Sequence, residues 1–213
     1  MRLLDLFCGA GGAAMGYHRG GFEVVGVDIK PQPHYPFEFI QADALEFVSE
    51  HGAEFDVIHA SPPCQRYSHC TPAAYREGHP DLIAATRALL EDTGKPFVIE
   101  NVAGARYLLR EPLMLCGTMF GLRVWRHRYF EIWPRLEFFK RLQCQHTESP
   151  VPVYGHTGAG TNRNRERARG RSNSVADWRA AMDIDWMTAA ELAQAIPPAY
   201  TKWIAGAQYW EAT

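Results

Sequence analysis

The chain has 213 residues, a formal net charge of −2 and hydrophobic residues at 46% of its positions. This size and composition suit one globular domain with a buried core, and they argue against a polycationic or disordered chain. No stretch reaches the roughly 18 apolar residues of a membrane span, and no signal-peptide layout is present, so we expect a cytoplasmic protein without a membrane partner. Any surface for nucleic acid must come from local clustering of charge.

Short apolar runs alternate with helical stretches through the first two thirds of the chain. Helices are expected at residues 13–19 and 80–90, and strands at 2–7, 22–28, 38–41, 55–60, 96–102, 113–116 and 129–133. Strands separated by helices predict an α/β fold, with a mostly parallel sheet covered by helices on both faces.

The pattern changes after Trp133. Residues 155–174 contain no Leu, Ile, Val, Met, Phe, Tyr or Trp, so they predict a loop. Thr188 is a plausible N-cap, with Glu191 at the capping-box position, for a helix over residues 189–195. Pro197 and Pro198 should stop that helix, and a last helix is expected over 201–210. We therefore predict three parts: a core at 1–133, an insert at 134–174 and a segment at 175–213 that packs back on the core.

A glycine turn follows the first predicted strand, in DLFCGAGG at residues 5–12. Glycines at the start of a helix let a ligand approach the backbone, and ligands in such sheets bind at the carboxyl ends of the strands. Asp28 ends the second strand, where an acid commonly binds ribose hydroxyls, and Asp43 follows the third, where an acid could accept from an adenine amino group. Without GxGxxG or a phosphate-binding Lys, an adenosyl ligand is favoured. A tight turn with surface acids is the alternative.

Ser61-Pro62-Pro63-Cys64-Gln65 follows the fourth strand directly. Two prolines hold the cysteine on a stiff, non-helical backbone, which suits an exposed nucleophile more than a packed thiol. A free thiol has a pKa near ~8.5, so a thiolate here needs help from its neighbours. The alternative is a turn with an incidental cysteine.

Glu100-Asn101-Val102 ends the fifth strand, and Arg126-His127-Arg128 precedes the strand expected at 129–133. A carboxyl group in line with Cys64 is a candidate acid or hydrogen-bond partner. Arginines at i and i+2 point to one side of an extended chain, so both could face the same pocket. Taken alone, each feature is better explained by a structural role: a capping or salt-bridged Glu, and a solvated pair of arginines at the start of a strand.

The five cysteines are scattered without a CxxC pair, which is typical of reduced thiols. Cys144 and His146 are close in sequence, but no partner pair stands at zinc-ligand spacing, so no metal site is expected.

DLFCGAGG, SPPCQ, ENV and RHR stand in one order, and with them the chain resembles the DNA cytosine-5 methyltransferase family over residues 1 to about 133. The resemblance implies a Rossmann-like methyltransferase fold and S-adenosyl-L-methionine as cofactor. It further implies methyl transfer to carbon 5 of cytosine in double-stranded DNA. Only residues 134–174 occupy the place of the family's large target-recognition domain. A compact, phage-like member is therefore expected, in a bacterial cytoplasm or that of a phage host.

The resemblance also implies roles for individual residues. The Cys64 thiolate would add to carbon 6 of a flipped-out cytosine, Glu100 would hold its N3 edge and an arginine its O2 oxygen. The chain departs from the family at Val124, which replaces a Gln, and at residues 193–198, which lack the usual Gly-Asn. The implied residues are, for catalysis, Cys64, Glu100, Arg126 and Arg128; for the cofactor, Phe7, Gly9, Gly11, Asp28, Asp43 and Pro62; and for DNA, Gln65 and Ser68.

A local cation cluster lies in the insert, where arginines alternate with small or polar residues: Arg163, Arg165, Arg167, Arg169 and Arg171. It suits phosphate binding without sequence reading, so we expect a short target context; a surface loop is the alternative. A monomer without a protein partner is expected. Three other functions stay open: methylation of RNA cytosine, a methyltransferase-like module that activates another protein, and methylation of a free nucleotide.

Overall fold

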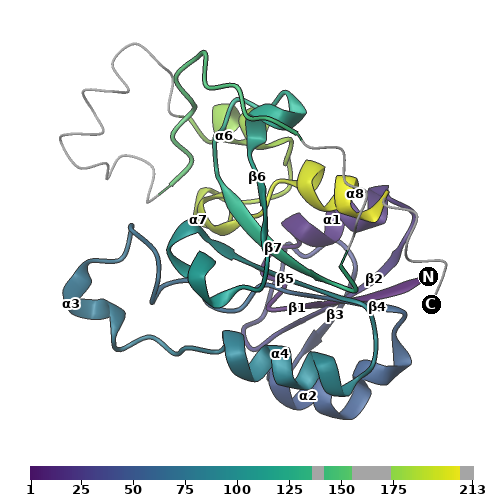
Figure 1. Cartoon of the computed structure of the whole chain (residues 1–213). Coiled ribbons are helices and arrows are strands. Elements are labelled where there is room, and N and C mark those ends of the chain that lie inside the picture. Colours follow the sequence, from purple (N-terminus) through teal and green to yellow (C-terminus); the bar gives the residue numbers. More distant parts are fainter. Residues whose placement is uncertain (136–141, 155–173, 207–213) are drawn as a thin grey trace.

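The computed structural model describes residues 1–135, 142–154 and 174–206 (Figure 1). Seven strands form one sheet in the order β3-β2-β1-β4-β5-β7-β6. The strands from β3 to β5 in this order are parallel neighbours, and β7 is antiparallel to β5 and β6. The predicted α/β fold with a mostly parallel sheet is confirmed. The strands are β1 (Arg2–Leu6), β2 (Glu23–Asp28), β3 (Glu38–Gln41), β4 (Val57–Ala60), β5 (Phe97–Val102), β6 (Leu113–Leu115) and β7 (Arg128–Trp133).

Helices cover both faces of the sheet. Successive residues of a strand point to opposite faces, and the central strands carry apolar residues on both, so each face must be covered. The chain forms α1 (Gly12–Arg19), α2 (Ala44–His51), α3 (Ala73–Arg76), α4 (Ile83–Asp92), α6 (Val175–Met182), α7 (Ala189–Gln194) and α8 (Pro198–Ala205). It also forms the short 3-10 helices η1 (Gly52–Glu54), η2 (Ala103–Leu108) and η3 (Gly117–Phe120). Figure 1 shows α2 and α4 together on one face and α1 and α8 on the other.

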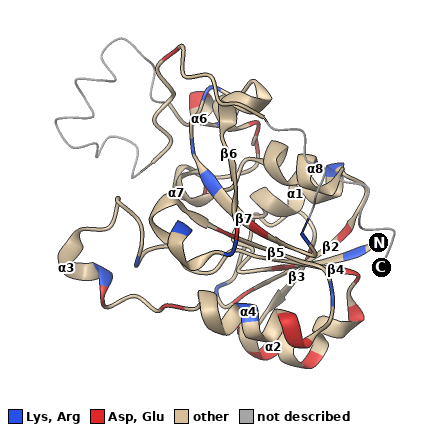
Figure 2. Ribbon diagram, viewed as in Figure 1, with Lys and Arg blue, Asp and Glu red and all other residues tan. Residues whose placement is uncertain are grey.

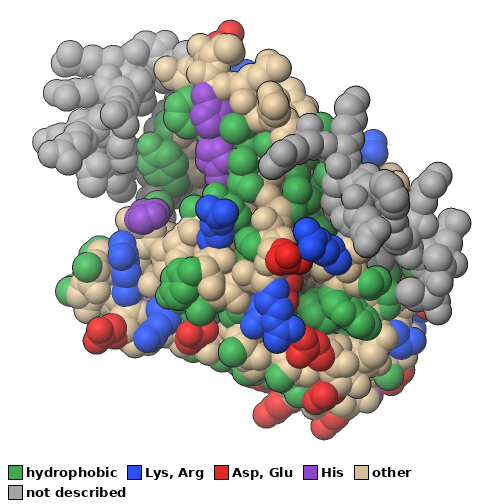
Figure 3. Space-filling view, in the orientation of Figure 1, with side chains coloured by type: hydrophobic (Ala, Val, Ile, Leu, Met, Phe, Trp, Pro, Cys, Tyr) green, Lys and Arg blue, Asp and Glu red, His purple; other side chains and the backbone are tan. Residues whose placement is uncertain are grey.

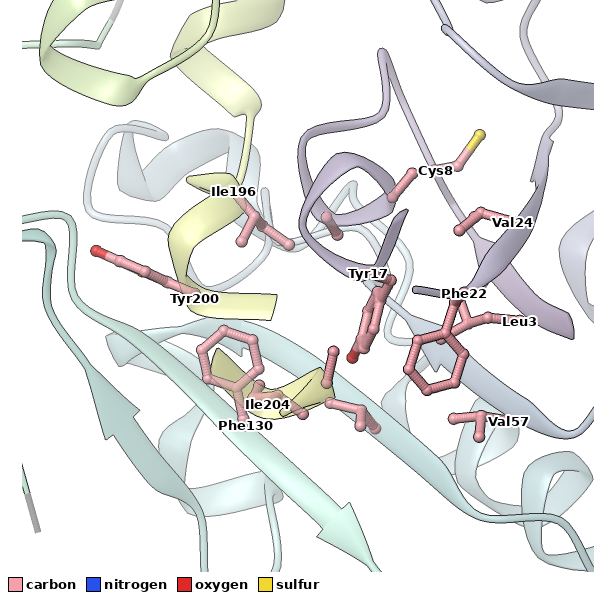
Figure 4. Packing of buried hydrophobic residues seen from close by; sticks show 14 of the residues in the cluster. Leu3, Cys8, Tyr17, Phe22, Val24, Val57, Phe130, Ile196, Tyr200 and Ile204 are labelled. Carbon is pink, nitrogen blue, oxygen red and sulfur yellow. The ribbon is translucent and has the colours of Figure 1, made fainter. Parts of the chain in front are cut away.

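The face under α1 and α8 is filled by aromatic and aliphatic side chains from distant parts of the chain, among them Tyr17, Phe130 and Tyr200 (Figure 4). The two helices approach so closely that a Cβ on Gly16 would lie 1.9 Å from the Thr201 hydroxyl oxygen. That hydroxyl donates to the carbonyl of Ala13 at 2.8 Å. Glycine in α1 therefore permits the helix contact that closes this face.

Two expectations for the C-terminal region have different outcomes. The Thr188 capping box with Glu191 is confirmed, and the helix runs to Gln194. The predicted start of the last helix was wrong: α8 begins at Pro198, not at residue 201. Residues 201–205 are helical as predicted, and residues 207–210 of the predicted helix lie outside the described residues. Proline is favourable in the first turn of a helix, where its missing N–H would have no partner, so Pro198 opens the helix that the prolines were expected to precede.

A third apolar cluster joins α6 and α7 to the segment at 151–153, around the fully buried Trp178. The indole N–H of Trp186 donates to the Ala10 carbonyl at 2.8 Å, so this region contacts the glycine turn directly. The three-part division itself stays a prediction. Within the described ranges, none of the helices has the length and apolarity to span a membrane.

Candidate active site

Parallel strands bring their carboxyl ends to one edge of the sheet, and the antiparallel β7 begins at that edge. Arg128 stands beside Val102 in the register of β7 with β5. Its Nε atom lies 3.0 Å from Oε1 of Glu100, whose side chain is nearly buried. The structure therefore brings together two of the residues singled out in the sequence, from positions 28 residues apart in the chain.

Cys64 lies in the loop that follows β4, at the same edge. Its carbonyl accepts from the amides of Tyr67 at 3.0 Å and Ser68 at 2.9 Å, so the chain turns immediately after the cysteine. The side-chain amide of Asn101 donates to the carbonyl of Pro62 at 3.0 Å. This bond fixes the proline segment to β5, next to Glu100, and leaves the thiol partly accessible.

The charges at this edge act on one another. Burial raises the pKa of the Cys64 thiol, and the Glu100 carboxylate raises it further, whereas Arg128 and Arg126 lower it. Burial also raises the pKa of Glu100, against the opposing effects of Arg128, Arg126 and the Ser61 side chain. Each of these two groups therefore holds its proton more firmly than it would in water.

Arg126 binds backbone carbonyl groups, whereas Arg128 pairs with a carboxyl group. Its guanidinium donates to three backbone carbonyls: Ala195 at 2.7 Å, Val153 at 2.8 Å and Ala193 at 2.6 Å. Three of its N–H groups are thereby engaged in joining the C-terminal region and the 142–154 segment to the core. Its charge reaches Cys64 and Glu100, but contact with a ligand stays a prediction.

A buried polar chain supports the site and was missed in the sequence. His59, fully buried in β4, has Nδ1 3.0 Å from the Tyr17 hydroxyl and Nε2 3.0 Å from the Ser61 hydroxyl. The Ser61 side chain in turn lies close enough to Glu100 to lower the pKa of its carboxyl group. Burial lowers the pKa of His59 to about 3, so the ring is neutral and offers one donor and one acceptor. The available signal was a polar residue inside the apolar run FDVIHA.

The glycine turn lies at the ends of β1 and β2. Phe7, Gly9 and Gly11 have φ values of 57°, 50° and 82°, so the backbone curls tightly around this edge. The amide of Gly9 donates to Asp28 Oδ2 at 3.1 Å, and a Cβ on Gly9 would meet no atom within 4 Å. An open space thus adjoins the turn, with an acid beside it. Asp5, buried below with neither carboxyl oxygen hydrogen-bonded, has its pKa raised by burial and by Asp28.

The remaining residues predicted to contact the cofactor or DNA differ in how far their side chains are already engaged within the protein. Asp43 caps α2, with Oδ1 accepting from the amides of Leu45 at 2.8 Å and Glu46 at 3.2 Å, so one oxygen serves the helix. The Ser68 hydroxyl accepts from the amide of Cys70 at 3.1 Å. Gln65 is partly exposed next to Cys64. The five arginines of the insert, Arg163, Arg165, Arg167, Arg169 and Arg171, lie outside the described residues.

Comparisons with known proteins agree on the N-terminal half. The family model of C-5 cytosine-specific DNA methylases matches residues 1–109. The type II methyltransferase M.FnuDI of Fusobacterium nucleatum is 31% identical over 113 residues, which are 49% of this chain and 33% of that protein. M.AgeI of Thalassovita gelatinovora is 27% identical over 121 residues, 49% of this chain and 28% of that protein. The match thus spans about a third of these relatives.

Two solved structures share the fold along nearly the whole chain. One, described as a DNA modification methyltransferase encoded within an E. coli prophage, has a TM-score of 0.63 at 15% identity and covers 98% of both chains. The S. pombe Dnmt2 methyltransferase has a TM-score of 0.59 at 12% identity and covers 97% of both.

Proposed function

Because the chain belongs to the C-5 cytosine-specific DNA methylase family, we propose that it methylates carbon 5 of cytosine in DNA. The observation that carries the proposal is the convergence of Cys64, Glu100 and Arg128 at one edge of the sheet, with Arg128 Nε 3.0 Å from the Glu100 carboxyl oxygen. These groups supply a nucleophile, a hydrogen-bonding acid and a positive charge, which activation of a cytosine ring requires.

Cys64 acts as the nucleophile. Its thiolate adds to carbon 6 of the base, which makes carbon 5 electron-rich. Glu100, whose raised pKa favours a shared proton, hydrogen-bonds N3 and the amino edge. Arg128 holds Glu100 in place and stabilises charge that develops on the ring. After carbon 5 has received its methyl group, loss of its proton and expulsion of Cys64 restore the aromatic ring.

The methyl donor we assign is S-adenosyl-L-methionine, which supplies an electrophilic methyl group when bound. The open space beside Gly9 and the acid at the end of β2 fit an adenosyl ligand. Asp28 would hold the ribose, and Phe7, Gly11 and Pro62 would line the rest of the site. Asp43 keeps one carboxyl oxygen for an adenine amino group, since only Oδ1 caps α2.

Double-stranded DNA approaches from the edge that carries Cys64. Acidic residues gather on and beside α2, on the face of the sheet that α2 shares with α4, and this surface is unsuited to a phosphate backbone (Figure 2). A cytosine in a duplex is inaccessible, so the base must flip out at a cost of a few kcal/mol. Gln65 and Ser68 contact the DNA near the flipped base, and the five insert arginines bind phosphates. The target context is short, and the enzyme acts as a monomer without a protein partner.

The decisive experiment measures methyl transfer from labelled S-adenosylmethionine to duplex DNA, with bisulfite sequencing of the product. Cys64→Ala should abolish transfer, and Cys70→Ala, which removes an exposed thiol in the same loop, should retain it. Transfer by the Cys64 variant would contradict the covalent mechanism. A strict target of four to six bases, on the order of a restriction site, would contradict the short context. Transfer to RNA alone, or none from a folded protein that binds cofactor, would favour the other functions considered above.

A further inference from the structure

Four potential metal ligands gather on the side of the molecule that carries the insert. They are Cys116, which precedes η3; His127, which precedes β7; and Cys144 and His146 in the 142–154 segment. Their ligand atoms all lie within 4.8 Å of one another. Sequence spacing did not reveal the cluster because its first two members are 11 residues apart and lie in separate elements.

The distances already approach those of a coordination sphere. Cys116 Sγ lies 3.3 Å from Nε2 of His146. Tetrahedral zinc, with Zn–S near 2.3 Å and Zn–N near 2.0–2.1 Å, places its sulfur and nitrogen ligands about 3.6 Å apart. The whole cluster needs a contraction of about 1 Å at its widest pair, which side-chain rotation can supply.

The histidine rings are held in position by aromatic packing. Trp125 stacks on His146 with ring centroids 4.2 Å apart and an interplanar angle of 13°. The rings of His127 and His146 meet edge to face at 5.1 Å. Figure 3 shows histidine side chains gathered on this part of the surface beside hydrophobic ones. Packing with neighbouring aromatic rings therefore fixes the orientation of both imidazoles.

Hydrogen bonds, more than apolar contacts, hold the segment that carries Cys144 and His146: the Gln145 amide donates to the Thr118 hydroxyl at 3.0 Å and the Val151 amide to the Arg123 carbonyl at 2.7 Å. Only Val151 and Val153 of residues 142–154 are buried in an apolar cluster. Four polar residues of this segment line a hollow of about 520 Å³: Gln145, Thr147, Glu148 and Ser149. A cross-link at Cys144 and His146 would fasten the segment where apolar contacts do not.

We propose that Cys116, His127, Cys144 and His146 bind one Zn²⁺ ion in a closed, four-ligand structural site. Two thiolates and two imidazoles are the donor set that tetrahedral zinc prefers, whereas Mg²⁺ and Ca²⁺ require oxygen ligands. The site joins the insert to the peptide between Arg126 and Arg128. Metal binding therefore stabilises the start of β7 as well as the insert, and it is independent of whether the chain methylates DNA.

Metal content provides the test. Protein purified from cells grown in zinc-supplemented medium, and then dialysed, should contain about one zinc ion per chain. Inductively coupled plasma mass spectrometry measures this content. Cys144→Ser and His146→Asn should each lose most of it. Cys70→Ser and His69→Asn change two exposed residues that are not part of the cluster, and both variants should retain the zinc. Undiminished zinc in the first two variants, or a wild-type protein that binds no zinc after reconstitution, would overturn the proposal.

Two further measurements guard against a variant that simply misfolds. Replacement of the wild-type ion by Co²⁺ should give thiolate-to-cobalt charge-transfer absorption and the visible bands of a tetrahedral site. A reversible chelator should make residues 142–154 sensitive to protease, and added zinc should restore protection. An octahedral cobalt spectrum would contradict the site. So would a Cys116–Cys144 disulfide found by non-reducing mass spectrometry in freshly purified protein.

Discussion

Two buried Arg–Glu pairs involve Glu100 of β5 and Glu131 of β7, one on each face of the sheet, and the pairs are built differently. On the α4 side, Arg87 Nε and Nη2 donate to Oε1 and Oε2 of Glu131, both at 2.7 Å, and the amide of Arg110 adds a bond at 2.8 Å. On the α1 side, Arg128 makes one contact with Glu100 at 3.0 Å, and Oε1 of Glu100 lacks a hydrogen bond of good geometry.

Burial does not explain this difference, because Glu131 is 4% exposed and Glu100 is 6% exposed. The Glu131 carboxylate is fully paired, as a structural charge in low dielectric must be. Glu100 retains unused hydrogen-bonding capacity at the edge that carries Cys64. Under the proposed function, we expect substrate to complete the hydrogen bonding of Glu100.

The largest effect should come from Glu100→Gln. The amide keeps the shape but removes the acid, so we expect methyl transfer to fall by roughly 10²–10⁴-fold with little change in the free energy of unfolding. Single-turnover kinetics at saturating DNA and urea unfolding measure the two quantities. If the variant unfolded easily and remained active, the contrast between the pairs would be wrong.

Glu131→Gln tests the other pair. Removing this charge leaves Arg87 buried without its partner, so we expect the free energy of unfolding to fall by about 3–5 kcal/mol. Methyl transfer by the remaining folded protein should persist. As a matched control, the double variant Arg87→Met/Glu131→Leu should recover much of the loss, because it removes both charges. A double variant no more stable than Glu131→Gln would argue against charge burial as the cause.

The polar chain behind Glu100 gives the third test. The pKa of His59 falls from 6.5 to about 3 on folding, so below pH 6.5 the unfolded chain binds a proton that the folded protein excludes. His59 should therefore leave the free energy of unfolding unchanged above pH 6.5. Below that pH it should lower this free energy by up to about 1.4 kcal/mol per pH unit, down to pH 3. His59→Gln should reduce this slope in urea unfolding between pH 7 and 5, and exposed His69→Gln should not. Equal slopes for His59→Gln and wild type would refute the assignment.

The smallest effect concerns the reactivity of Cys64. Glu100 raises the pKa of this thiol and Arg128 lowers it. At neutral pH we therefore expect faster alkylation of Cys64 in Glu100→Gln and slower alkylation in Arg128→Gln, each within about tenfold. Iodoacetamide labelling followed by peptide mass spectrometry separates Cys64 from the other cysteines. The opposite order of the two variants would exclude direct electrostatic coupling.

The sequence predicted the strands and the edge of the site well, because these depend on short apolar runs and on residues directly after them. It missed α2, although Asp43 and Glu46 stand at N-cap and N3 spacing, because Asp43 was interpreted as a ligand only. It could not separate Arg126 from Arg128. The partners of Arg126 are carbonyls at Val153, Ala193 and Ala195, which only the folded chain brings near.

The same limit applies to long-range polar contacts. Nothing local pairs Arg87 with Glu131, 44 positions later, or brings the Tyr17 hydroxyl to His59. Such contacts depend on strand order and on which face a side chain occupies. Sequence patterns suggest the strand order and the face of each side chain, but only the assembled sheet determines them.

The contact of α1 with α8 has a consequence for the order of synthesis. A ribosome completes α1 early and α8 almost 180 residues later, at roughly 5–20 residues per second. Until Thr201 can donate to Ala13, the apolar surface around Tyr17 lacks its last cover. The nascent chain therefore exposes this apolar surface while the Cys64 loop and β7 are being translated. We expect a chaperone to bind there, and the face to close only when α8 emerges.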